Sequence, residues 1–274
     1  MRLLRNADKG SHARDGRLHP PLRGARGLPG LAVCGALAAL LLAPAPVRAT
    51  SFSSVPCPLA LVLALDVSSS VDEREYALQM KGLAAAFREE TVQSAIMATG
   101  GILVTAFEWS GRDQHVTHAD WRYLATRADI ETFADLLARS RRQHTSYPTA
   151  LGYALGHAAI RLSSAPRRCL RQVVDISGDG VNNEGFPPAS AYRAFDYARI
   201  TVNGLVVRGA DPDPLPYYTR EVIRGSGAFV EVAETYSDYA RAMARKLLRE
   251  ISGAPLAGLE RYRAGPHASI PVTR

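Results

Sequence analysis

The sequence predicts a doubly wound α/β domain, in which a mostly parallel β-sheet has helices packed on both faces. Short, continuous apolar segments alternate with longer amphipathic segments along most of the chain, as is typical of β-α units with right-handed crossovers. The apolar segments are unbroken, as expected for strands that are buried on both faces of a parallel sheet. The 274 residues suffice for one domain of this kind with appendages.

The first half of the chain predicts three strands and a helix. The run 58–66, PLALVLALD, reads as a buried strand that ends in an acid. A helix is expected at 72–89, where apolar residues recur at steps of three and four. A second strand is expected at 101–109, GILVTAFEW, and a short third strand near 115–117.

The second half continues the same alternation of periodic and apolar segments. Helices are expected at 129–139, 149–162, 188–199, 217–224 and 237–251, and strands at 169–177, 200–207 and 228–233. The segment 253–274 is rich in Gly, Pro and Ala and has no apolar periodicity. We expect it to be a disordered tail.

Residues 1–49 are expected to be a signal peptide. Basic residues precede the apolar run from Leu31 to Ala43, which is shorter than the roughly 20 residues of a spanning helix and has the length of a signal-peptide core. Cleavage is expected after Ala49, leaving a domain at 50–252. The protein is therefore predicted to be exported, to the periplasm or outside the cell, and membrane-attached only if this segment is not cleaved.

The charge distribution argues against a nucleic-acid partner. The formal net charge is +7, but residues 1–49 hold eight Lys and Arg against two acids. The remaining 25 basic and 24 acidic residues nearly balance. The part expected to fold therefore lacks the basic excess that binds phosphate backbones.

Oxygen-bearing side chains follow the ends of two expected strands. Asp66, Ser68 and Ser70 form a D-x-S-x-S pattern after the first strand, and Asp179 follows the strand at 169–177. Ligands of open α/β sheets bind outside the carboxyl ends of the strands, and such hard oxygen ligands suit Mg²⁺, Mn²⁺ or Ca²⁺. The alternative is that Asp72 or Ser70 merely caps the following helix.

This pattern, with Thr145 between its two halves, resembles the metal-ion-dependent adhesion site of von Willebrand factor type A (vWA) domains. Thr145 is identified by Ala150 and Leu151, five and six positions later, as in the family. The chain also resembles the bacterial domain-of-unknown-function family 1194 of exported vWA proteins, in the segments LALDVSSSVD, FEWSG, SYPTAL, DISGDGVNNEG and GSGAFV. One departure is His144, where the family usually has Gly before the Thr.

The resemblance implies a six-stranded sheet of order 3-2-1-4-5-6 with strand 3 antiparallel. It also implies a metal site, with Mg²⁺ as the expected ion and Mn²⁺ or Ca²⁺ as alternatives. Ser68, Ser70 and Thr145 would bind the metal directly, whereas Asp66 and Asp179 would bind it through water.

The vWA strand order makes the strands that begin near Cys57 and Cys169 neighbours. Both cysteines would then lie at the amino ends of these strands, close enough for a disulfide. An exported protein favours the bridge, and two buried free thiols are the alternative.

The resemblance implies a protein that holds a partner through the metal, with an acidic side chain of the partner filling an open coordination position. The chain is not expected to be an enzyme, because it contains no G-x-S-x-G, P-loop or H-E-x-x-H motif, and no small-molecule substrate is evident. The alternatives are a metal-assisted phosphoester hydrolase and a structural module whose metal only orders the loops.

Three further groups of residues have open interpretations. Arg141 and Arg142 either attract an acidic partner or belong to a solvated loop. Tyr217 and Tyr218 are expected to pack in the core, the alternative being an interaction surface. Asn182, Asn183 and Glu184 are expected to shape the loop after Asp179.

Overall fold

The computed structural model describes residues 57–253, and the predicted signal peptide and C-terminal tail lie outside them, apart from Gly253. The sheet has the strand order β3-β2-β1-β4-β5-β6. All neighbouring strands are parallel except β2 and β3, which are antiparallel. This confirms the expected fold class. The strands are β1 (Cys57–Asp66), β2 (Ile102–Trp109), β3 (His115–Leu124), β4 (Cys169–Gly178), β5 (Ile200–Val207) and β6 (Val230–Ala233).

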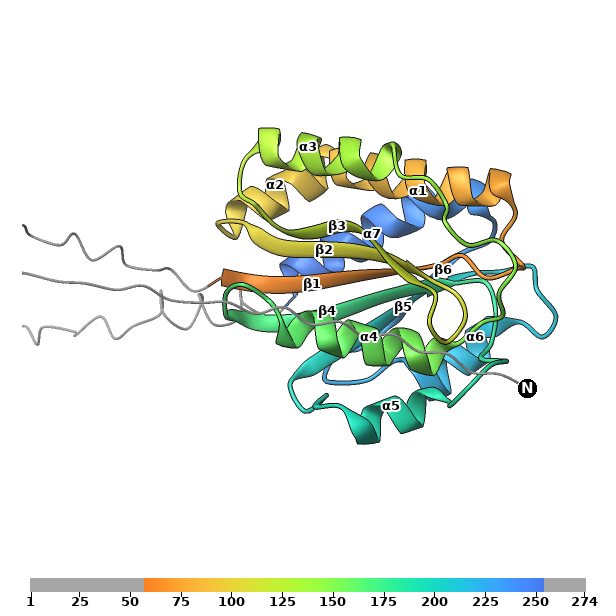
Figure 1. Ribbon diagram of the computed structural model, residues 1–274. Coiled ribbons are helices and arrows are strands. Elements are labelled where there is room, and N and C mark those ends of the chain that lie inside the picture. Colours follow the sequence, from red (N-terminus) through yellow and green to blue (C-terminus); the bar gives the residue numbers. More distant parts are fainter. Residues whose placement is uncertain (1–56, 254–274) are drawn as a thin grey trace, which may run out of the picture. The chain divides into compact units, whose positions relative to one another are not determined.

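Helices cover both faces of the sheet (Figure 1). The helices are α1 (Glu73–Arg88), α2 (Glu90–Ala98), α3 (Arg127–Ala138), α4 (Leu151–Ser163), α5 (Pro188–Ala194), α6 (Pro214–Tyr217) and α7 (Tyr239–Ser252), with a π-helical turn η1 (Tyr218–Val222) and a short 3-10 helix η2 (Tyr236–Asp238). Apolar residues of α1, α2, α3 and α7 form one core cluster, and those of α4, α5 and η1 form the other. No helix among residues 57–253 is long and apolar enough to cross a membrane.

The central strand β1 separates the two cores. Leu59, Leu61, Leu63 and Leu65 belong to the core under α1 and α7, and the alternate residues Ala60, Val62 and Ala64 to the core under α4. This alternation follows from the two-residue period of a strand. At its amino end, β1 is joined to β4 by a disulfide between Cys57 and Cys169, the pair that the vWA strand order implied.

Four elements differ from the expected boundaries. The segment after Arg88 forms a second helix, α2, which the sequence reading left unassigned and which buries Val92 and Ile96. Strand β3 has ten residues, more than the short stretch expected. The sequence underestimates its length because this edge strand has polar residues at its exposed positions, which weaken the apolar pattern. Helix α5 ends at Ala194, because Phe195 is already extended. The expected helix at 217–224 is divided between α6 and η1.

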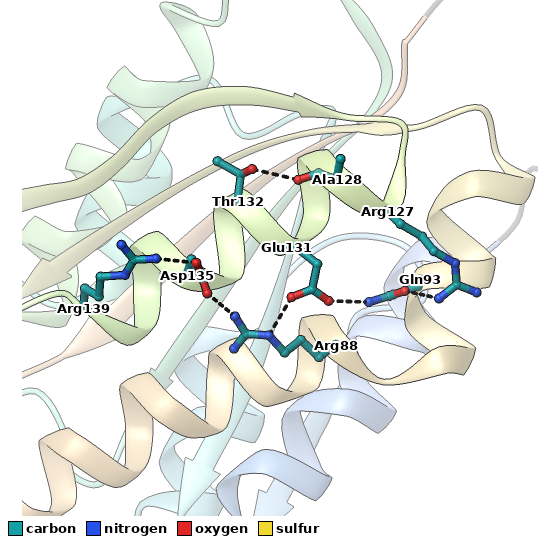
Figure 2. Close-up of polar contacts among 8 residues, drawn as sticks. All are labelled: Arg88, Gln93, Arg127, Ala128, Glu131, Thr132, Asp135 and Arg139. Atoms are coloured by element: carbon teal, nitrogen blue, oxygen red, sulfur yellow. Dashed lines mark hydrogen bonds and ion pairs between the residues drawn. The ribbon is translucent and has the colours of Figure 1, made fainter.

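The outer helices α1, α2 and α3 are joined by a polar network (Figure 2). Arg88 of α1 donates to Glu131 and Asp135 of α3, at 2.8 and 2.5 Å. Gln93 of α2 donates to Glu131 and accepts from Arg127, at 3.1 and 2.5 Å. The network holds these three helices together.

Candidate metal centre

The loop after β1 orders its own backbone around Asp66. Asp66 Oδ1 accepts a hydrogen bond from the Ser68 backbone N–H at 2.8 Å. Helix α1 is capped by Asp72, whose carboxylate accepts from the Glu75 N–H at 2.7 Å while Glu75 returns a bond to the Asp72 N–H. This capping box leaves the hydroxyls of Ser68 and Ser70 free for another role.

Hydrogen bonds bring Asp179 to this loop from the end of β4. Ser70 Oγ donates to Asp179 Oδ1 at 2.7 Å, and the hydroxyls of Ser68 and Ser70 lie 3.2 Å apart. Four of the five metal ligands expected from the sequence therefore form one connected cluster at the carboxyl edge of the sheet.

The two carboxylates of this cluster are buried, and neither forms an ion pair with a residue of the range 57–253. Asp66 is 0% exposed and Asp179 is 8% exposed. Burial, and secondly the charge of Asp179, raises the pKa of Asp66 well above its usual value. Burial also raises the pKa of Asp179, against the hydrogen bond from Ser70. Within 57–253, Asp66 Oδ2 has no hydrogen-bond partner, so a bound cation would satisfy an atom that the chain leaves unpaired.

Arg142 is the basic residue whose charge acts on both carboxylates of this cluster. Its guanidinium, however, donates its hydrogen bonds to backbone carbonyls. It donates to the carbonyls of Val67 and Ser68 at 2.8 and 2.9 Å and to the carbonyl of His144 at 2.7 Å. Arg142 lowers the pKa of Asp66 only as a minor effect. It therefore ties the loop of residues 140–148 to the loop after β1, rather than pointing into solvent.

Thr145, the fifth expected ligand, is exposed, and its hydroxyl lies 3.4 Å from that of Ser146. No hydrogen bond of the described structure joins it to Asp66, Ser68, Ser70 or Asp179. A second threonine, Thr149, is 3% exposed. Its Oγ1 would lie 3.5 Å from a Cβ atom on Gly180, next to Asp179 in the chain.

Asparagine side chains hold Thr149 beside the loop that follows Asp179. The Thr149 N–H donates to Asn183 Oδ1 at 2.8 Å, and the Asn183 N–H donates back to the Thr149 carbonyl at 3.0 Å. Asn182 Oδ1 accepts from the Gly152 N–H in α4 at 3.3 Å. The sequence reading missed Thr149, although Thr149 is also followed by Ala and Leu at the fifth and sixth positions, Ala154 and Leu155.

Two buried tyrosines complete the surroundings of the carboxylates. Tyr218 is 0% exposed and belongs to the core under α4, which agrees with the expected core packing. Burial, and secondly the charges of Asp66 and Asp179, raises its pKa. Tyr236, just before α7, is close enough to Asp179 to lower the pKa of that carboxyl. The sequence does not indicate that either tyrosine lies near these carboxylates, because both belong to short helical turns without a recognisable periodicity.

The donors of this cluster fit a hard divalent cation. Carboxylate and hydroxyl oxygens are the ligands that Mg²⁺, Mn²⁺ and Ca²⁺ prefer. No group of three or more His, Cys, Asp and Glu side chains within the described range is arranged to hold a metal. The candidate site is therefore the mixed set of two carboxylates and neighbouring hydroxyls.

Solved structures of similar fold include a von Willebrand factor type A protein. A von Willebrand factor type A protein from Catenulispora acidiphila matches 71% of this chain and 43% of its own, with 15% identity and a TM-score of 0.51. Proximal thread matrix protein 1 from the mussel byssus matches 72% of this chain and 48% of its own, with 13% identity and a TM-score of 0.53. A structure of the same mussel protein is described as having a zinc-occupied MIDAS motif; its identity is 14%, its TM-score 0.52, and the match covers 72% of this chain and 48% of that one. The chain thus spans less than half the length of these proteins, and at this identity the similarity shows the fold alone.

The chain belongs to the family described as "Protein of unknown function (DUF1194)", whose model matches residues 56–255. No functionally curated protein matches the sequence.

Proposed function

We propose that this protein is an exported vWA-type adhesion module that holds Mg²⁺, or Mn²⁺ or Ca²⁺, and uses the ion to bind an acidic side chain of a partner protein. The observation that supports the proposal most is the pairing of Asp66 with Asp179. These two carboxylates are buried side by side, and Asp66 Oδ2 has no partner within residues 57–253. A buried charge of this kind is costly unless it is paired or coordinates a metal.

The ion would be held by Asp66, Ser68, Ser70, Asp179 and one threonine. We assign the threonine position to Thr149 in place of Thr145, because Thr149 is buried and bonded to the loop after Asp179, whereas Thr145 is exposed. Substituting each threonine by alanine separates the two assignments. Thr149→Ala is expected to weaken Mn²⁺ binding at least tenfold, and Thr145→Ala to leave it unchanged; the reverse result would restore Thr145.

Recognition of an acidic partner follows from the charge of the site. Water-mediated contacts to two carboxylates, together with neutral hydroxyl ligands, leave the ion electrophilic, so an incoming Asp or Glu gains strongly from binding it. The zinc-occupied MIDAS motif of the mussel protein supports a divalent cation in a domain of this fold. The Cys57–Cys169 disulfide supports export, since such bonds persist in oxidising compartments.

Thermal unfolding with and without metal tests whether the ion binds. The purified chain is compared in EDTA and in millimolar Mg²⁺, Mn²⁺ or Ca²⁺. An ion that binds only the folded state stabilises it by about 2.7 kcal/mol at 100 times its Kd, so the melting temperature should rise and then saturate. The Asp66→Ala/Asp179→Ala variant should show no rise; a rise of equal size in the variant, or none in either protein, contradicts the proposal.

A second experiment tests whether the ion keeps an open position. Water exchanging on protein-bound Mn²⁺ enhances water-proton relaxation, and a peptide that contains one aspartate should displace this water and reduce the enhancement. The matched peptide with asparagine should have no effect. If no exchanging water is found, the metal only orders the loops. Turnover of p-nitrophenyl phosphate that disappears in Asp66→Ala would instead establish the hydrolase alternative.

A further inference from the structure

Tyr218 occupies a slot between Gly178, at the carboxyl end of β4, and Gly204, in the middle of β5. Its ring lies so close to Gly204 that a Cβ atom there would be 2.8 Å from Tyr218 Cδ1. Its hydroxyl lies so close to Gly178 that a Cβ atom there would be 2.5 Å from Tyr218 Oη. Both distances are shorter than those at which real Cβ atoms are found. Only glycine at positions 178 and 204 therefore leaves room for the Tyr218 side chain.

The slot directs the phenol hydroxyl to the Asp66 carboxylate. The same Cβ position on Gly178 would be 2.7 Å from Asp66 Oδ2, so both oxygens lie around a single point. Tyr218 Oη and Asp66 Oδ2 are both buried, and neither has a hydrogen-bond partner in the described part of the chain. A phenol can donate a hydrogen bond, whereas an ionised carboxylate can only accept one. Tyr218 Oη is therefore a donor without an acceptor, and Asp66 Oδ2 is an acceptor without a donor.

We propose that Tyr218 is a positioning residue of the metal centre, whose hydroxyl is hydrogen-bonded to Asp66 Oδ2 through one bridging water molecule. This inference rests on the proposed metal-binding function. The Ser68 N–H already holds Asp66 Oδ1 at 2.8 Å. With Tyr218 on the second oxygen, the carboxylate is oriented from both sides, and the charge that attracts the cation is stabilised.

Tyr218→Phe tests this role, because it removes the hydroxyl and keeps the ring that fills the slot. Loss of an outer hydrogen bond to a metal-binding group typically weakens binding by about 10- to 100-fold, and we expect a loss of this size in Mn²⁺ affinity, measured by electron paramagnetic resonance. The melting temperature in EDTA is expected to fall only slightly, because the net contribution of one hydrogen bond to folding is small.

Tyr197→Phe is the matched control. Tyr197 is also buried in the core under α4, but its hydroxyl donates to the Leu155 carbonyl at 2.6 Å. Its loss should lower the melting temperature and leave the Mn²⁺ affinity unchanged. A spectroscopic readout adds to this: Mg²⁺ should change the near-ultraviolet absorption of tyrosine in the unmodified chain and in Tyr197→Phe, but much less in Tyr218→Phe.

The outcomes separate this inference from the proposed function. If the unmodified chain binds Mn²⁺ and Tyr218→Phe binds it equally well, the role of Tyr218 is overturned while the metal site stands. If both tyrosine variants weaken binding equally, the effect comes from packing, and the role is again overturned. If the unmodified chain does not bind Mn²⁺, the proposed function fails and this inference fails with it.

Discussion

Residues 57–253 contain a pair of buried carboxylates under α7 and another at the carboxyl edge of the sheet, and within this range only the pair under α7 contacts a basic side chain. Under α7, Asp175 of β4 and Glu250 of α7 both contact Lys246 Nζ, at 2.8 and 2.6 Å. Asn203 of β5 adds a hydrogen bond to Glu250 Oε1 at 2.8 Å. All of these side chains are buried, so this acid pair has a positive partner within the domain.

At the carboxyl edge, Asp66 and Asp179 have hydroxyl and backbone donors but form no ion pair with any described residue. The edge also differs in access, because Ser70, which donates to Asp179, is exposed. A buried acid pair costs free energy unless its charge is compensated. The acid pair that forms no ion pair within residues 57–253 thus lies beside an exposed residue, whereas the pair that contacts Lys246 lies in the interior.

Removal of the internal cation is expected to have the largest effect. Lys246→Met leaves Asp175 and Glu250 without a positive partner, and breaking a buried ion pair in this way costs about 3–5 kcal/mol. Urea unfolding in EDTA measures the loss. A loss below about 1 kcal/mol would show that Lys246 does not compensate this pair and would remove the basis of the comparison.

Removal of the disulfide is expected to destabilise the domain without touching either acid pair. Cys57 and Cys169 are 112 residues apart in the chain, and losing a native disulfide typically costs about 2–5 kcal/mol. The Cys57→Ser/Cys169→Ser variant should therefore unfold at lower urea but bind Mn²⁺ with unchanged affinity. Weaker binding, measured where the variant remains folded, would mean that the two edges of the sheet are coupled.

The pH dependence of stability is expected to distinguish the acid pair under α7. Burial raises the pKa of Asp175 from 3.8 to about 7, with the charge of Lys246 opposing it and that of Glu250 adding to it. Between these pH values the folded state keeps a proton that the unfolded state has lost. The free energy of unfolding should therefore fall as the pH rises from about 4 to 7, by up to about 1.4 kcal/mol per pH unit from this group.

Asp175→Asn removes this contribution, so its stability in EDTA should depend less steeply on pH over the same range. Urea midpoints at several pH values measure both proteins. Parallel pH profiles for the variant and the unmodified chain would contradict the assignment of a raised pKa to Asp175.

The smallest expected effect is the loss of one hydroxyl at the proposed metal site. Ser70→Ala removes the donor to Asp179 and one proposed metal ligand, so the Mn²⁺ affinity should fall about tenfold, or about 1.4 kcal/mol. Ser69→Ala is the matched control, since Ser69 is an exposed neighbour on the same loop and its hydroxyl is not a proposed ligand. Equal affinities of the two variants would remove Ser70 from the site.

The sequence predicts that Asp66 and Asp179 lie together at the carboxyl edge of the sheet, but it does not predict which threonine lies beside them. Asp66 and Asp179 follow apolar runs that are unmistakable strands, so their place at the carboxyl edge follows from the topology. Thr145 and Thr149 are four residues apart, and each is followed by Ala-Leu at the same distance. Spacing therefore cannot choose between them, whereas the burial of Thr149 and its hydrogen bonds with Asn183 support our proposal of Thr149.

The sequence patterns do not predict contacts between side chains of segments that are far apart in the chain. Lys246 lies in an amphipathic helix, where a lysine is usually solvated, and only the packing of α7 on β4 shows that it is buried against Asp175. The Tyr218 hydroxyl and Asp66 Oδ2 both lie near Gly178 because glycines at positions 178 and 204 leave room for the Tyr218 side chain. In both cases the partner is set by three-dimensional packing rather than by periodicity.

Mn²⁺ titration of three proteins, followed by electron paramagnetic resonance, tests the central claim most directly. The unmodified chain and Asp175→Asn should each bind a single ion per chain with similar affinity, because the acids under α7 already have Lys246. Asp66→Asn, which keeps the shape of the side chain and removes its charge, should lose this binding. Retention of the ion by Asp66→Asn, or no ion bound by the unmodified chain at millimolar Mn²⁺, would contradict the account.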